Sequence, residues 1–444
     1  MGATFTSKDK QYILSFLSGS GLVISDADRD KYIDVFVSDL KRALSSKSSS
    51  LNIFPSYVKF VDKVTQRDKF AVFQLGQVNM TKAYFDSTGD KFDIYGEMSF
   101  PMPGLGKEVS AEDFFRAVMN NARDVLRKNL KVGISMSHAI ESTEDGDGRL
   151  LNWARAKVKC KELEGKMIAE EFKKYLQKEF DEDYQVFIVN NATATLIAGL
   201  VKSDEKEFED FIGLIHADGY NLSYIEEVQN ISSHLKSKRQ FSGKMIINTQ
   251  AGSFDKIKYS QADTEAVKML GEIQVGKFSH LVNSLCIPLI VKGVVGELAK
   301  SKRIEGCLVE AINDIKDLDL EQIMLFLNKG LKSQSEITSL IKVANLGDMA
   351  MLAVVFDSVI ERAAKLVAIQ LAGIMRYKDI GHNPLQPVGI VVSGNFYEIV
   401  RDFEYRVRCE LYKYFGQNDP RYLKFLYMPN ASLLGAGIAA ATNL

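Results

Sequence analysis

The fold is decided by Tyr184-Gln-Val-Phe-Ile-Val-Asn190-Asn191-Ala-Thr-Ala-Thr195 and by a second apolar run, ending in Gly213-Leu-Ile-His-Ala-Asp-Gly219, within a stretch that reaches Glu227. Short β-branched runs that stop at small polar residues predict buried strands whose carboxyl ends open into loops. A helix starting near Ala194 would turn backbone N–H groups toward that edge, where open α/β sheets bind ligands. A plain strand–turn–helix unit without a ligand fits the same pattern.

Composition places the chain among ordinary globular proteins. Its 444 residues predict two domains, and 46% hydrophobic with 25% charged residues is a typical balance. The 56 basic and 57 acidic side chains give a formal charge of −1. We therefore expect neither nucleic acid nor a membrane as a partner.

Cysteine usage and the apolar segments bear on the compartment. Cys160, Cys286, Cys307 and Cys409 show no zinc or disulfide spacing, which favours a reducing cytoplasm. The first residues have no apolar signal region, and the apolar segment 349–375 carries four charges, which predicts a buried helix.

The remaining pattern is α/β. Helices are predicted within residues 7–45, after Ser110, through 263–375 and over 403–414. Strands are predicted at 70–75, at 78–85 continuing toward 92–95, at 132–138, at 388–393 and at 423–428. Gly76-Gln77 marks a tight turn between the first two strands.

Landmarks in order along the chain match one known family. They are Asn52-Ile-Phe-Pro55-Ser-Tyr-Val58, the hairpin Phe70–Asn79, Ser137, Trp153-Ala154-Arg155, Val189–Thr195, Gly213–Glu227, Ile247-Asn-Thr-Gln250 with Gly252, Lys268-Met269, Arg362-Ala-Ala and Gly435-Ala-Gly437. Over nearly its whole length the chain resembles the eukaryotic-type hexokinase family.

The resemblance implies an α/β, two-lobed actin-like ATPase (ribonuclease H-like) fold. A small lobe, 68–190, would carry the first phosphate hairpin and the sugar loop. Residues 1–67 and 191–444 would form the large lobe, with the C-terminal end packing on the small one. The cleft between the lobes would hold a hexose, with glucose the first candidate, beneath ATP and Mg²⁺.

The same resemblance assigns the site residues. The sugar would contact Ser137, Ala154, Arg155, Asn190, Asn191, Asn221 and Gln250. The nucleotide and phosphate loops would be Gln74, Gly76, Gln77, Asn79, Ala217, Asp218, Gly219, Ser393, Gly394 and Asn395. We assign no metal ligand from the sequence.

Charged groups of the family are missing from these positions. Asn191 stands where the family has its catalytic aspartate, and Gln74 stands where an aspartate faces the metal. Gln250 replaces a glutamate, whereas Asp218 adds a negative charge to a phosphate loop. A carboxamide is no general base at neutral pH, and Mg²⁺ prefers anionic oxygen ligands.

Three functions stay open on this evidence. The first is a catalytically impaired homologue that serves as a sugar sensor, a structural subunit or a regulator with a protein partner. The second is an active ATP-dependent hexokinase of glycolysis that phosphorylates O6 through a displaced carboxylate such as Asp218. The third, weaker one is an actin-like assembly protein. His138 and His216 lie nearest the motifs, but their strand-end positions favour core or surface roles.

Overall fold

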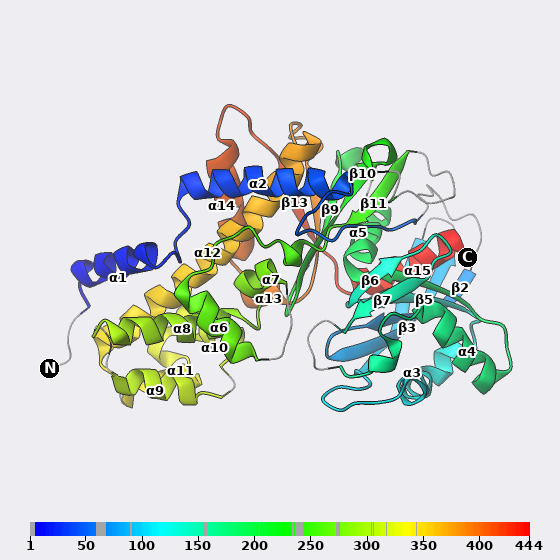
Figure 1. Cartoon of the computed structure of the whole chain (residues 1–444), viewed down its shortest axis with the longest axis horizontal. Helices are drawn as coiled ribbons and strands as arrows, with labels where there is room; N and C mark the ends of the chain where they lie inside the picture. The colour runs from blue at the N-terminus through cyan, green and yellow to red at the C-terminus, as the bar shows by residue number, and fades with distance from the viewer. Residues whose placement is uncertain are drawn as a thin grey trace.

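The computed structural model describes residues 5–58, 68–88, 91–153, 158–203, 205–232, 235, 243–271, 276–302, 304, 306–316, 318–342 and 344–444. Its elements form two lobes, each built on its own sheet (Figure 1). The expected α/β, two-lobed architecture is confirmed. Among the described helices, none is both long enough and apolar enough to span a membrane.

The small lobe contains a five-stranded sheet in the order β4-β3-β2-β5-β8. Strand β2 (Asp68–Leu75) is antiparallel to β3 (Asn79–Thr88) and parallel to β5 (Lys131–Met136), which is parallel to β8 (Gln185–Asn190). Edge strand β4 spans Lys91–Pro101. A separate hairpin pairs β6 (Ala139–Ser142) with β7 (Gly148–Asn152).

Alternation along β2 explains why both faces of this sheet are covered. Ala71 and Phe73 pack in one core with helices α3 (Ala111–Leu126) and α4 (Ile168–Phe180). Phe70 and Val72 point to the other face, as the two-residue period of a strand requires. That second face packs against α5 (Asn191–Lys202) and α15 (Ala431–Asn443).

The large lobe contains a six-stranded sheet in the order β1-β11-β10-β9-β12-β13. Its strands are β1 (Phe54–Pro55), β9 (Phe211–His216), β10 (Tyr220–Glu227), β11 (Lys244–Asn248), β12 (Val388–Ser393) and β13 (Leu423–Tyr427). Strand β12 runs parallel to both β9 and β13, whereas the β9–β10–β11 order is antiparallel. The mixed sheet therefore collects loops from β9, β11 and β12 at one edge.

The helices of the large lobe pack around the long helix α12 (Leu346–Lys378), which confirms the buried helix predicted from the apolar segment. The others are α1 (Ser7–Gly19), α2 (Asp26–Leu44), α6 (Gln261–Leu270), α7 (Lys277–Val282), α8 (Ile287–Lys300), α9 (Gly306–Asp314), α10 (Leu320–Lys329), α11 (Glu336–Ser339), α13 (Phe396–Ile399) and α14 (Phe403–Phe415).

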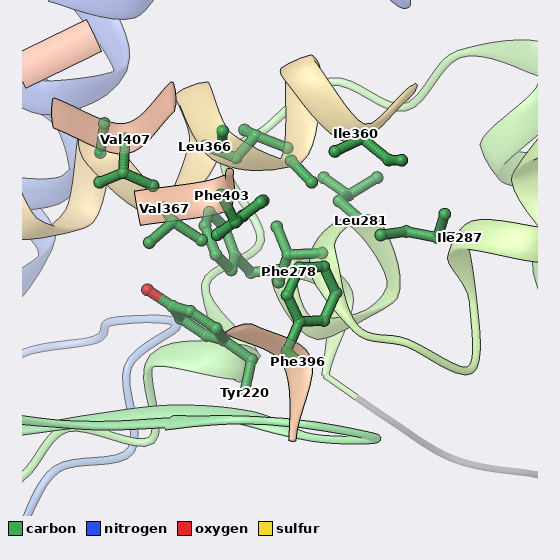
Figure 2. Packing of buried hydrophobic residues seen from close by; sticks show 14 of the residues in the cluster. Tyr220, Phe278, Leu281, Ile287, Ile360, Leu366, Val367, Phe396, Phe403 and Val407 are labelled. Carbon is green, nitrogen blue, oxygen red and sulfur yellow. The ribbon is translucent and has the colours of Figure 1, made fainter. Parts of the chain in front are cut away.

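Aromatic side chains join these helices to the sheet. Figure 2 shows Tyr220 of β10 and Phe396 of α13 beneath residues of α7, α12 and α14. The ring of Tyr220 lies 5.1 Å from that of Phe278, and Phe396 lies 4.7 Å from Phe403, both centroid to centroid. This core fixes the ends of β10 and β12.

Helix α15 connects the lobes, because it packs on both α5 and strands β2 and β5 (Figure 1, red). A Cβ atom at Gly435 would lie 1.8 Å from the Ala194 carbonyl oxygen, so only glycine allows this approach. The glycines of the Gly435-Ala-Gly437 motif thus have a packing role. The lobe boundaries expected from the sequence stay a prediction.

Two local predictions are wrong. Helix α5 begins at Asn191, three residues earlier than Ala194, because the Asn190 side-chain oxygen accepts the Ala192 N–H (3.0 Å) and caps the helix. The second strand does not continue through residues 92–95. It ends at Thr88, and residues 91–101 form β4, which pairs back against it.

Candidate functional site

A cavity of about 630 Å³ lies between the two sheets, and residues from both lobes line it. Fifteen of the predicted site residues line this cavity. They are Gln74, Gly76, Gln77, Asn79, Ser137, Asn190, Asn191, Ala217, Asp218, Gly219, Asn221, Gln250, Ser393, Gly394 and Asn395. The other two, Ala154 and Arg155, lie outside the described residues. Residues from six separate stretches of sequence therefore meet at one site, and their individual roles stay predictions.

The β2–β3 hairpin is fastened to the loop that follows β5. The Gln77 Nε2 donates to the Ser137 carbonyl (3.1 Å), and His138 Nε2 donates to the Gly76 carbonyl (3.0 Å). The Gln77 Oε1 is buried and has no hydrogen-bond partner among the described residues. The Gln77 side chain thus spans the turn that the resemblance assigns to a phosphate loop.

Asn191, at the start of α5, donates from Nδ2 to the Ser137 hydroxyl oxygen (3.2 Å). Asn190 next to it uses its oxygen for the helix cap and donates to the Met136 carbonyl (3.4 Å). Both amides are oriented by the protein, and both residues line the cavity. A neutral amide there can hold a hydroxyl group, but it cannot remove its proton at neutral pH.

A network of amides shapes the floor of the cavity. The Asn221 side chain donates to Asn248 Oδ1 (2.8 Å) and accepts from the Leu222 and Ala251 N–H groups (2.8 and 3.1 Å). These bonds fix the segment that carries Gln250. The Gln250 side chain makes no hydrogen bond to the described residues and lines the cavity.

The loop after β9 carries the acid among the described lining residues. Its turn is closed by the Ala217 N–H, which donates to the Gly219 carbonyl (2.9 Å), and the Asp218 carboxylate accepts from the Ser284 hydroxyl (2.7 Å). Gly394 lies against this loop at φ 112°, where a Cβ would come 2.3 Å from the His216 carbonyl oxygen. The loops after β9 and β12 therefore meet closely.

His216 lies behind this loop and is no candidate base. It is fully buried, its ring is stacked 3.8 Å from that of Phe396, and its Nε2 donates to the Val282 carbonyl (2.8 Å). Burial lowers its pKa to about 3, so the imidazole is neutral at physiological pH. The core role expected from the sequence agrees with this position.

Some lining residues were not among the site residues predicted from the sequence, and one of them, His138, was expected in a core or surface role. These are Asn52, Val78, Thr81, Ser99, His138, Ala139, Asn152, Ile215, Tyr220, Gly252, Ser253, Gly276, Ser279. Several lie at strand ends or in loops that only the tertiary fold brings together. Gly276 is required by packing, because a Cβ atom there would lie 2.2 Å from the Gly252 carbonyl oxygen.

The described lining residues offer a metal-bound triphosphate one carboxylate, Asp218, and no lysine or arginine. They contain no group of three or more His, Cys, Asp or Glu side chains arranged to hold a metal ion. Gln74 offers a neutral oxygen where the family has a carboxylate, and Asp218 is already bonded to Ser284. We therefore derive no chemical step through Mg²⁺ or ATP.

The two-lobed fold with a cleft between its sheets defines the actin-like ATPase architecture of sugar kinases. Residues 211–442 match a family model described as hexokinase, and residues 19–201 match a second hexokinase model. The chain belongs to the hexokinase family. The resemblance stated from its motifs is thereby confirmed.

Individual relatives are distant. Mouse Hexokinase-1 is 23% identical over 441 residues, which cover 91% of this chain and 43% of that protein. Rice Hexokinase-7 is 23% identical over 375 residues, covering 80% of this chain and 76% of that protein. The chain spans about half the length of the first curated relatives it matches.

Solved structures share the fold. The hexokinase from Schistosoma mansoni, complexed with glucose, has a TM-score of 0.79 at 18% identity and covers 98% of this chain and all of its own. A second hexokinase crystal structure has a TM-score of 0.76 at 17% identity, covering 98% of this chain and 99% of its own.

Replacing Gln250 with glycine is expected to remove the carboxamide without loss of the fold. Gln250 has φ 49° and ψ 42°, a left-handed conformation that costs a non-glycine residue about 1–2 kcal/mol. Glycine relieves this strain but adds about 0.5–1 kcal/mol of chain entropy cost. Urea titration should give an unfolding free energy within about 1 kcal/mol of the parent. A loss above about 2 kcal/mol would contradict this account of the backbone.

Proposed function

We propose that this protein is a catalytically impaired hexokinase homologue that keeps a sugar-binding cleft and serves as a sugar sensor, regulator or structural subunit. One observation supports the proposal. The cavity brings together the positions that the resemblance assigns to the site, yet Gln74, Asn191 and Gln250 offer amides where the resemblance leads us to expect carboxylates. Each amide has nearly the shape of the carboxylate it replaces but carries no charge.

The chemical consequence is loss of phosphoryl transfer. A general base contributes roughly 10²- to 10⁴-fold to a rate, and Asn191 cannot supply one. The transition state of phosphoryl transfer depends on positioning and on compensation of phosphate charge. Asp218 instead places a negative charge beside the phosphate loops, which opposes binding of a triphosphate.

Sugar binding is supported by the polar groups that remain. Ser137, Asn190, Asn191, Asn221 and Gln250 all line the same cavity, and hydrogen bonds orient three of these amides. A related hexokinase was solved in complex with glucose, so glucose is the first ligand to test. A protein partner and a cytoplasmic location are part of the proposal and rest on the sequence alone.

The proposal predicts that glucose 6-phosphate formation by the parent does not exceed that of the Gln250→Gly variant purified in parallel. A coupled assay at high protein concentration with Mg²⁺ and ATP measures both. The variant controls for contaminating kinases, because it is expected to keep the fold while losing a sugar contact. Activity in the parent alone would overturn the proposal.

The alternative is an active ATP-dependent hexokinase of glycolysis that phosphorylates O6 of glucose or another hexose with Mg²⁺. The position of Asp218 favours it, because this carboxylate lies in the cavity and is oriented by Ser284. If the parent is active, Asp218→Asn should abolish the activity. Unchanged activity in that variant would exclude Asp218 as the base.

A further inference from the structure

Carboxamides are the most numerous class of side chain in the cavity wall. Ten of its lining residues are Asn or Gln, namely Asn52, Gln74, Gln77, Asn79, Asn152, Asn190, Asn191, Asn221, Gln250 and Asn395. Hydroxyl groups of serine, threonine and tyrosine fill much of the remainder, and the described lining contains no lysine or arginine. The wall is therefore polar but almost uncharged.

These amides divide into two groups. Gln77, Asn190, Asn191 and Asn221 hold the site together through the hydrogen bonds described above. The side chains of the other six make no hydrogen bond to the described residues and are free to meet a ligand. They are Asn52, Gln74, Asn79, Asn152, Gln250 and Asn395.

Three of these six amides lie in the half of the cleft that the resemblance assigns to phosphates. Gln74 and Asn79 belong to the β2–β3 hairpin, and Asn395 follows β12 in the opposite lobe. The hydroxyls of Thr81 and Ser99 lie on the hairpin side, 2.8 Å apart. Both halves of the cavity thus present the same neutral chemistry.

Carboxamides recognise hydroxyl groups, because each offers donors and an acceptor to a group that is itself donor and acceptor. A triphosphate requires more than neutral donors, since a multiply charged anion taken from water is best compensated by cations, and the described lining contains no lysine or arginine. Here Asp218 adds a negative charge, and the Gln77 amide fills the turn that would face phosphate. The hairpin half suits a second polyol unit better than a nucleotide.

We propose that the cleft binds a neutral oligosaccharide of at least two hexose units. One unit occupies the Asn191 and Gln250 end, and the next lies along Gln74 and Asn79. The cavity of about 630 Å³ is in the size range of sites that bury a ligand larger than a single hexose. This inference rests on the proposed function, because it requires that the hairpin does not take ATP.

Isothermal titration calorimetry of the whole chain with glucose, maltose, cellobiose and Mg·ATP tests the proposal. At least one disaccharide should bind about tenfold or more tightly than glucose, which is about 1.4 kcal/mol. The double variant Gln74→Ala, Asn79→Ala should lose that gain and keep the glucose affinity of the parent. Asn418→Ala, which removes an exposed amide on the loop after α14, is the matched control and should change neither.

Three outcomes would overturn the inference. Glucose binding without any gain for either disaccharide would remove the second sugar position, while the proposed sensor function would stand. A disaccharide gain that survives the double variant would place the second unit elsewhere. Binding of Mg·ATP together with glucose phosphorylation would overturn the inference and the proposed function together.

Discussion

The triple variant Asn191→Asp, Gln74→Asp, Asp218→Thr is expected to phosphorylate glucose at least about 10²-fold faster than the parent, because a positioned base contributes roughly 10²- to 10⁴-fold. Asn191 already lies 3.2 Å from the Ser137 hydroxyl, so a carboxylate there would be oriented by the same contact. A carboxylate at position 74 would offer Mg²⁺ an anionic oxygen. Replacing Asp218 removes the charge that opposes the triphosphate.

A coupled assay of initial rates, with each single variant alongside, measures this gain. The single changes should each give much less, since base, metal ligand and charge removal act on one reaction. Adding Gln250→Gly to the triple variant should lower the new activity again. A triple variant that binds glucose but phosphorylates it no faster than the parent would contradict the view that the missing carboxylates prevent phosphoryl transfer.

Arg362→Met is expected to lower the free energy of unfolding by about 3–5 kcal/mol, because it leaves the buried carboxylate of Asp263 without its partner. The two side chains are 3% and 1% exposed, and both guanidinium Nη atoms donate to the carboxylate (2.9 and 2.6 Å). Ser260 donates to the same carboxylate from its N–H and its hydroxyl (2.7 and 2.8 Å). The pair joins α6 to α12.

Denaturant titration measures this loss, and Arg116→Met is the matched control. Arg116 pairs with Glu112 at 2.7 Å on an exposed surface, where solvent screening leaves such a pair little effect on the free energy of unfolding. The double variant Arg362→Met, Asp263→Leu should recover most of the loss, because no lone charge then stays buried. Equal effects of Arg362→Met and Arg116→Met would refute the structural role of the buried pair.

The same pair predicts how stability depends on pH. Burial alone would raise the pKa of Asp263, but the charge of Arg362 and the hydrogen bonds hold that pKa below its ordinary value. The unfolded carboxyl, with a pKa near about 3.9, therefore binds protons more readily than the folded one. The Asp263 carboxylate therefore contributes fully to the free energy of unfolding above the unfolded pKa. That contribution is lost as the pH falls through the pKa of the folded state.

Much of the fold could be predicted because local pattern and burial coincide. The apolar runs before Asn190 and His216 are strands β8 and β9, and their polar ends open into the cavity as expected. The start of α5 is predicted too late because Asn190 is both the last residue of β8 and the N-cap of α5. The spacing of apolar residues does not identify a residue with both roles. Residues 92–95 belong to β4 and not to β3. A sequence of strand-forming residues does not show where the chain reverses direction, so the two antiparallel strands are predicted as one.

The candidate site was found through motifs, whereas its hydrogen bonds were not. Gln77 and Ser137 are sixty residues apart in the chain, and only the parallel pairing of β2 with β5 brings them together. Asn152, Ser253 and Ser279 belong to no motif and reach the cavity from the end of β7, from a short 3-10 turn and from α7. The ten amides come from separate stretches of sequence, so only the folded chain brings them together on one surface.

Saturation-transfer difference NMR on the parent, with glucose and Mg·ATP present together, tests the central claim most directly. The account predicts saturation of the glucose protons, none on the adenine protons, and no glucose 6-phosphate resonances during the experiment. Growth of glucose 6-phosphate signals that Gln250→Gly removes, or saturation that reaches adenine but not glucose, would contradict a cleft that binds sugar and no longer transfers phosphate.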